Sequence, residues 1–201
     1  MQEGINMNKL IGVVAAGGLS SRMGQDKSKL IFHDSENELV ALHLLSSVCD
    51  ETYLSKNAKQ ATSVDPKQVL IDEDEYLHHG PATALLTAHQ HFPDHAIFML
   101  GCDYPYLRLC DVEALVKARH ASSEITCYYQ ALAGFAEPLI CIYEANARKN
   151  LVNDLAASQF SLQRFIQKRK TLYVVPSDVN ILTSIDTPEQ YKHFHTHQHE
   201  R

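Results

Sequence analysis

The sequence feature that most constrains the fold is the apolar run at residues 10–14, which breaks directly into the paired glycines Gly17-Gly18. An apolar run of this length that ends in glycines is typical of a buried strand followed by a loop with exposed backbone N–H groups. Such groups bind phosphate oxygens, and Arg22 and Lys27 add two positive charges close by. We therefore expect a polyphosphate site at this loop.

Spacing excludes two common phosphate loops. The pattern G-x-x-x-x-G-K-[ST] does not occur, and Gly17-Gly18 with Gly24 does not form G-x-G-x-x-G. The order G-G-x-S-x-R-M-G-x-D-K after a strand instead resembles the signature of the molybdenum cofactor guanylyltransferases, which attach GMP to molybdopterin. Sugar-nucleotide and cytidylyl enzymes of the same superfamily carry a looser version of it. A glycine turn that only joins two elements would not require so many fixed positions.

The resemblance implies a fold and an activity. The fold is a three-layer, Rossmann-like α/β nucleotidyltransferase fold with a mostly parallel central sheet. The activity is the transfer of GMP from GTP to the phosphate of molybdopterin, with Mg²⁺ as cofactor and pyrophosphate as the second product. It also implies brief contacts with other proteins of molybdenum cofactor synthesis.

Composition sets the broad limits. The 201 residues suit one α/β domain, which we place at residues 9–195 with flexible ends at 1–8 and 196–201. A formal net charge of −6 argues against general nucleic-acid binding. The sequence contains no membrane-spanning run and no signal-peptide pattern at its start, so a cytoplasmic location is expected. The five cysteines form no C-x-x-C pair and indicate reduced, mostly buried thiols.

The remaining pattern alternates short apolar runs with segments of helical spacing, as in βαβ units. We predict strands at residues 10–14, 52–55, 69–71, 96–100, 125–129, 138–143, 172–175 and 181–185. We predict helices at residues 39–49, 81–91, 112–119, 145–156, 162–169 and from 187 onward, with Asp111 as the N-cap of the third and a flexible histidine-containing tail at the end.

Candidate nucleoside contacts follow the second and third strands. Asn57 follows one strand end, where open parallel sheets bind ligands, although a turn residue is the alternative. The resemblance implies an Asn contact here, and an Asp between the third strand and the Gly80-Pro81 turn. Counting back from Gly80 favours Asp74, with Asp72 as the alternative. Ala84 replaces a glycine that is usual in the family, which leaves the base preference open.

Candidate metal and acceptor contacts follow the later strands. Asp103 ends the most apolar run, and its C-D-x-P-x-L setting matches the magnesium-binding Asp of the family. Glu137 occupies a turn that resembles one with acceptor contacts, and plain loop is the alternative. Ser184 and Asp186 stand where the family has Asn residues on the pterin side, which leaves the acceptor open.

The chemistry expected of these residues needs no general base, because an acceptor phosphate is already a nucleophile at neutral pH. Arg22, Lys27 and Asp103 are the predicted catalytic residues. Two other activities stay open: a related cytidylyl- or sugar-phosphate nucleotidyltransferase, and a nucleotide-binding module without turnover. The predicted nucleotide-binding residues are Ala15, Ala16, Gly17, Gly18, Lys27, Asn57, Asp74, Asp72 and Gly80.

Overall fold

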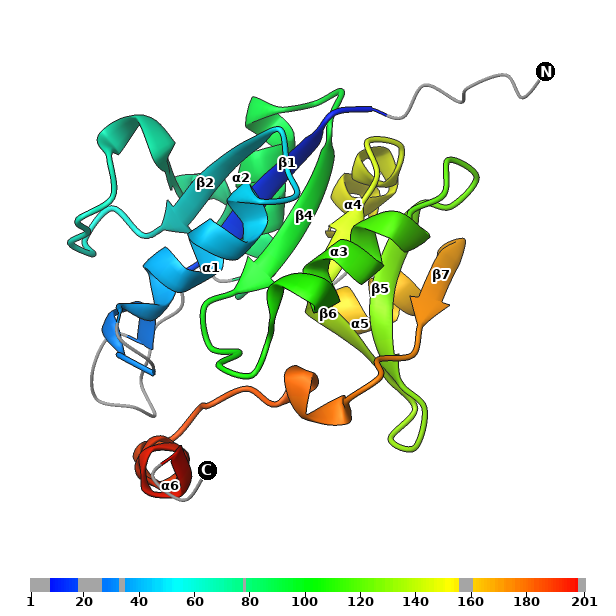
Figure 1. Cartoon of the computed structure of the whole chain (residues 1–201). Coiled ribbons are helices and arrows are strands. Elements are labelled where there is room, and N and C mark those ends of the chain that lie inside the picture. Colours follow the sequence, from blue (N-terminus) through cyan, green and yellow to red (C-terminus); the bar gives the residue numbers. More distant parts are fainter. Residues whose placement is uncertain (1–7, 18–26, 33–34, 78, 156–160, 199–201) are drawn as a thin grey trace.

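A computed structural model describes residues 8–17, 27–32, 35–77, 79–155 and 161–198 of the chain (Figure 1). The strands are β1 (Leu10–Ala15), β2 (Glu51–Lys56), β3 (Val69–Ile71), β4 (Ala96–Gly101), β5 (Ile125–Gln130), β6 (Phe135–Tyr143) and β7 (Thr171–Val174). The helices are α1 (Asn37–Ser46), α2 (Ala82–His91), α3 (Leu109–Ala118), α4 (Ala147–Leu155), α5 (Leu162–Gln167) and α6 (Pro188–Gln198). Four 3₁₀ turns complete the order: η1 (Lys27–Lys29), η2 (Pro66–Gln68), η3 (Asp74–Tyr76) and η4 (Val179–Leu182).

The seven strands form one sheet in the order β3-β2-β1-β4-β6-β5-β7. All neighbouring pairs are parallel except those of β6, which runs antiparallel to both β4 and β5. This mostly parallel α/β sheet is the architecture expected from the alternation of strands and helices, and that prediction is confirmed.

Helices cover both faces of the sheet, so its central strands are buried on both sides. Helices α2, α4 and α5 pack on one face, against side chains such as Ile11 and Met99. Helices α1 and α3 pack on the other, against side chains such as Val14 and Phe98. Because successive residues of β1 and β4 enter different cores, both strands are continuous apolar runs rather than alternating patterns.

One predicted strand is wrong. Residues 181–185 contain the 3₁₀ turn η4 and an irregular segment, not a strand. Asp178 starts this turn by accepting a hydrogen bond from Asn180 N at 2.9 Å, and Ile181 enters the α1/α3 core. Beyond the turn, Ile185 N donates to Asp103 O at 3.0 Å. The apolar residues of this segment therefore anchor the connection between β7 and α6, which passes the carboxyl end of β4.

One further local prediction, the N-cap of α3, is corrected. Asp111 is not an N-cap, because α3 begins two residues earlier; it lies in the first turn and accepts from Arg108 N at 3.0 Å. Helix α6 ends at Gln198, so its last residues lie within the segment after residue 195 that is predicted to be flexible. Helix α6 packs on a small separate core in which Phe194 and Ile185 meet Leu30 and Phe32.

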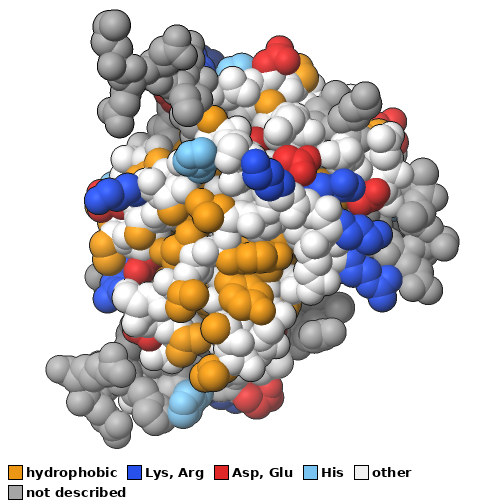
Figure 2. All heavy atoms as spheres, turned by 90° about the vertical axis from the view of Figure 1, so that its right-hand side faces the viewer, with side chains coloured by type: hydrophobic (Ala, Val, Ile, Leu, Met, Phe, Trp, Pro, Cys, Tyr) orange, Lys and Arg blue, Asp and Glu red, His pale blue; other side chains and the backbone are white. Residues whose placement is uncertain are grey.

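The outermost strand β7 leaves an apolar edge on the sheet. Tyr173 of this strand is 41% exposed, and its ring centroid lies 4.9 Å from that of Tyr129. Figure 2 shows this side of the molecule, with apolar side chains gathered in the middle of the face. Among the described helices, none combines the length and apolarity that crossing a bilayer requires.

Candidate active site

A pocket of about 280 Å³ opens at the carboxyl ends of the parallel strands. It lies where the sheet order changes direction, since β1 has β2 on one side and β4 on the other. Crevices at such a point are the usual ligand sites of open α/β sheets. The lining residues are Ala15, Ala16, Gly17, Lys27, Asp72, Gly80, Pro81, Ala84, Gly101, Cys102, Asp103, Leu139 and Asp186.

The start of the glycine loop is held by its neighbours on the β2 side. Ala16 N donates to Ser55 O at 2.9 Å, and Ala16 O accepts from the Gln60 side-chain amide at 3.0 Å. A Cβ added at Gly17 would collide with the Asp72 carboxylate. Position 17 therefore needs glycine for close approach, and the backbone here faces the pocket without a side chain in the way.

Asp72, rather than Asp74, is the carboxylate that the structure places in the pocket. Strand β3 ends at Ile71, so Asp72 is the residue at the strand tip, and its Oδ1 accepts from Ser55 Oγ at 2.5 Å. Burial raises the pKa of Asp72, while the Ser55 hydrogen bond opposes this rise. Asp74 starts the turn η3, is exposed, and is absent from the pocket lining.

The other two predicted nucleoside residues differ in their placement. Asn57 lies beside the glycine loop but is not among the lining residues, and its Oδ1 accepts from Lys59 N at 3.0 Å, as a turn residue does. Gly80 does line the pocket, with a φ of +58° that favours glycine. Ala84 of α2 contributes its methyl group to the same wall.

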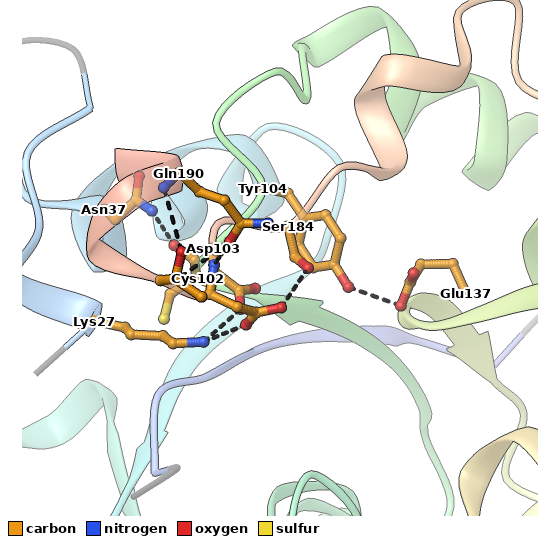
Figure 3. Close-up of polar contacts among 10 residues, drawn as sticks. Lys27, Asn37, Cys102, Asp103, Tyr104, Glu137, Ser184 and Gln190 are labelled. Carbon is orange, nitrogen blue, oxygen red and sulfur yellow. Dashed lines mark hydrogen bonds and ion pairs between the residues drawn. The ribbon is translucent and has the colours of Figure 1, made fainter. Parts of the chain in front are cut away.

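Lys27 connects two carboxylates at the other end of the pocket (Figure 3). Its ammonium group binds Asp186 Oδ1 directly and lies 3.6 Å from Asp103 Oδ2. Burial raises the pKa of Asp103, the positive charge of Lys27 lowers it, and the negative charge of Asp186 raises it further. The structure thus brings together three predicted residues that are far apart in the chain.

Asp103 keeps one oxygen without a protein partner. Its Oδ1 is buried and makes no hydrogen bond to the described part of the chain. A Cβ at Gly101 would lie 2.8 Å from this oxygen and 2.7 Å from the Tyr104 ring, so glycine lets both groups fold back over the strand end. Asp103 also lines the pocket, and carboxylate oxygens are natural ligands for a hard cation.

The predicted acceptor residues lie beside this carboxylate pair. Glu137 is buried next to it, and its Oε1 accepts from the Tyr104 hydroxyl at 2.7 Å and from Leu139 N at 3.2 Å. Burial raises the pKa of Glu137 to about 7. Ser184 Oγ donates to Asp186 Oδ2 at 3.0 Å. Only Asp186 of the three predicted acceptor residues lines the pocket itself.

Gly18 and Arg22 lie outside the described residues, so their predicted roles rest on the sequence alone. Two residues at the site are not predicted from the sequence: Gln60, whose side-chain amide donates to Ala16 O at the start of the glycine loop, and Leu139, which lines the pocket. Their residue types gave no signal. A glutamine in a polar segment and a leucine in a strand are ordinary, and only the fold brings them to the site.

The fold and the pocket define a class: an α/β protein of the nucleotidyltransferase architecture. A solved structure of molybdopterin-guanine dinucleotide biosynthesis protein A from Archaeoglobus fulgidus superposes with a TM-score of 0.71 at 17% identity, covering 95% of this chain and 100% of that one. A CMP:2-keto-3-deoxy-manno-octonic acid synthetase solved with CTP superposes with a TM-score of 0.66 at 15% identity, covering 96% and 100%. At these identities the superpositions establish the fold.

Sequence comparison gives the family. Residues 12–172 match the MobA-like NTP transferase domain, and the chain belongs to this family. A probable molybdenum cofactor guanylyltransferase of Geobacillus is 27% identical, covering 92% of this chain and 97% of its own length. A molybdenum cofactor biosynthesis bifunctional protein of Synechocystis is 26% identical over 93% of this chain, which spans 54% of that longer protein. The resemblance inferred from the glycine loop is thereby confirmed.

Proposed function

We propose that this protein transfers GMP from GTP to the phosphate of molybdopterin and releases pyrophosphate, with Mg²⁺ as its cofactor. The observation that carries the proposal is the pocket itself, which collects Gly17 at the start of the glycine loop, Lys27 and Asp103 at the carboxyl ends of the parallel strands. Relatives named as molybdenum cofactor guanylyltransferases at 24–27% identity support the choice of nucleotide and acceptor.

The nucleotide would lie along the pocket from Asp72 to Lys27. The Asp72 carboxylate can accept from the N1–H and 2-amino donors that distinguish guanine from other bases. Backbone N–H groups near Gly17 and the Lys27 ammonium group would bind the phosphates. Asp72 replaces Asp74 in this assignment because it is the residue at the pocket wall.

The metal assignment rests on the oxygen ligands available. Asp103 has a buried oxygen with no hydrogen-bond partner in the described part of the chain, and both Asp103 and Asp186 lie against the Lys27 ammonium group. Among the described residues no group of three potential metal ligands exists. This suits Mg²⁺, which is commonly held by one or two carboxylates and completes its shell with phosphate and water. When bound, the ion would withdraw charge from the phosphate oxygens around the reacting bond.

The reaction would be an in-line displacement at the α-phosphorus of GTP. A phosphate oxygen of the acceptor forms the new P–O bond, the α–β anhydride bond breaks, and the electron pair leaves with pyrophosphate. The Lys27 ammonium group would leave its ion pair with Asp186, bind the phosphates and stabilise the negative charge of the transition state. The residues act by holding and neutralising the reactants, so no side chain has to remove a proton.

The test is transfer of label to molybdopterin from each of α-³²P-labelled GTP, CTP, ATP and UTP, measured together with pyrophosphate release. We expect label in the product only with GTP, and loss of transfer in Asp103→Asn. Asp94→Asn is the matched control, because Asp94 is an exposed carboxylate just before the start of β4, whereas Asp103 follows the end of this strand. A preference for CTP would contradict the guanine assignment. Nucleotide binding without turnover under any condition would indicate a binding module.

A further inference from the structure

A fully buried carboxylate, Glu38, does not line the pocket and takes no part in the proposed chemistry. The Glu38 side chain is 0% exposed. Its Oε1 accepts from Lys29 Nζ at 2.6 Å and from Thr62 Oγ1 at 2.8 Å, while Oε2 has no partner within the described residues. Burying a carboxylate is costly even when it is paired. Stability alone is therefore a weak reason for an acid at this position.

Glu38 joins three segments that are separate in the sequence. It is the second residue of α1, Lys29 ends the turn η1, and Thr62 lies in the segment between β2 and η2. Lys29 also binds Glu36 at 2.7 Å, but that carboxylate is partly exposed. Of the two ion pairs of Lys29, the one with Glu38 is therefore the one that reaches a fully buried group.

The turn held by Glu38 is the turn that begins with Lys27. Within it, Leu30 N donates to Lys27 O at 3.2 Å, and Leu30 O accepts from Asn37 N at 2.9 Å. Lys29 lies two residues after Lys27 in the same single turn. A shift of the Lys29 backbone therefore moves Lys27 as well.

The start of α1 also holds the strand end that carries Asp103. The Asn37 side-chain amide donates to Cys102 O, directly before Asp103 (Figure 3). The start of α1 thus contacts both the turn of Lys27 and the end of β4. These two segments place Lys27 Nζ 3.6 Å from Asp103 Oδ2.

We propose that Glu38 is a positioning residue that acts through Lys29 to place the Lys27 ammonium group against the nucleotide phosphates. The inference rests on the proposed function, because it assumes that Lys27 binds a triphosphate. It assigns to Glu38 an effect on nucleotide affinity that depends on the presence of Lys27. A purely structural role would not have this dependence.

The experiment is a double-mutant cycle read by calorimetric nucleotide binding. The four proteins are the parent, Glu38→Gln, Lys27→Ala and the double variant. We expect Glu38→Gln to weaken GTP binding about tenfold in the parent and less than about twofold in the Lys27→Ala background, a coupling in the range known for connected residues. Equal weakening in both backgrounds, or none in either, would overturn the proposal.

Controls separate positioning from loss of fold. Glu144 directly follows β6, at the end of the sheet opposite the pocket, and its largely buried carboxylate pairs with Arg119. Glu144→Gln neutralises this carboxylate and should leave GTP affinity unchanged. If Glu38→Gln does not fold, Glu38→Asp replaces it in the cycle. This variant keeps the negative charge but moves it away from Lys29 by the length of one methylene group. It should show a smaller weakening that again disappears without Lys27.

The same experiment distinguishes the two proposals. If the parent binds another nucleotide better than GTP, the guanine assignment fails, and the cycle is measured with that nucleotide. A Lys27-dependent effect of Glu38 would then still support the positioning role. Failure of the parent to bind any of the four nucleotides would overturn both.

Discussion

The raised pKa of Glu137 leads to a stability prediction that needs no substrate. Burial is the main cause of the shift from the ordinary value of 4.5 to about 7, and the hydrogen bonds from Tyr104 and Leu139 oppose it. Between these two pH values the folded protein holds a proton on Glu137 that the unfolded chain has lost. Because the folded state binds more protons, the free energy of unfolding must fall as the pH rises through this window.

The magnitude follows from the two pKa values. The interval from 4.5 to about 7, at about 1.4 kcal/mol per pH unit, corresponds to about 3 kcal/mol of stability. This contribution is fully present below pH 4.5 and is lost above about pH 7. Glu137→Gln has nearly the same shape and can accept the same two hydrogen bonds, but it does not titrate.

Urea unfolding followed by circular dichroism from pH 5 to pH 8 measures the effect. We expect the stability of Glu137→Gln relative to the parent to increase by about 2 to 3 kcal/mol across this range. The comparison at each pH cancels titrations that both proteins share. Parallel stability curves for the two proteins would refute the argument and would mean that Glu137 is ionised in the fold at pH 5.

Three more predictions concern the pocket. Lys27→Ala should weaken triphosphate binding by about 1.5 to 3 kcal/mol and lower turnover about a hundredfold or more, measured by calorimetry and pyrophosphate release; near-normal turnover would exclude the assigned role. Asp72→Asn should reduce the preference for GTP over ATP and CTP in competition assays, whereas Asp74→Asn should behave like the parent, and the reverse order would restore Asp74 as the base contact. Gly17→Ala should weaken nucleotide binding because its Cβ collides with the Asp72 carboxylate, and an unchanged dissociation constant would show that the loop adapts.

Much of the fold followed from the sequence because its signals are local. The runs at β1 and β4 are continuous and apolar since helices bury them on both faces, and this pattern requires no knowledge of the partners. The segment at residues 181–185 also carries apolar side chains, at Ile181, Leu182 and Ile185, yet it forms a turn and a loop. Its apolar side chains are buried by tertiary contacts, which a count of apolar residues cannot distinguish from strand pairing.

The candidate site likewise contains residues that the sequence predicted and residues that only the structure identified. The sequence by itself determined that Asp103 follows the most apolar strand, and it predicted the phosphate-binding glycine loop with Lys27 as its cation, because each inference depends on residues within a few positions. Only the tertiary structure decided that Asp72 faces the pocket and Asp74 does not, since the end of a strand cannot be placed to within two residues from its pattern. The contact between Lys27 and Asp186 spans 159 positions in the chain. Such a pairing exists only because the C-terminal segment crosses beneath β4, where sheet order and core packing bring the two charges together.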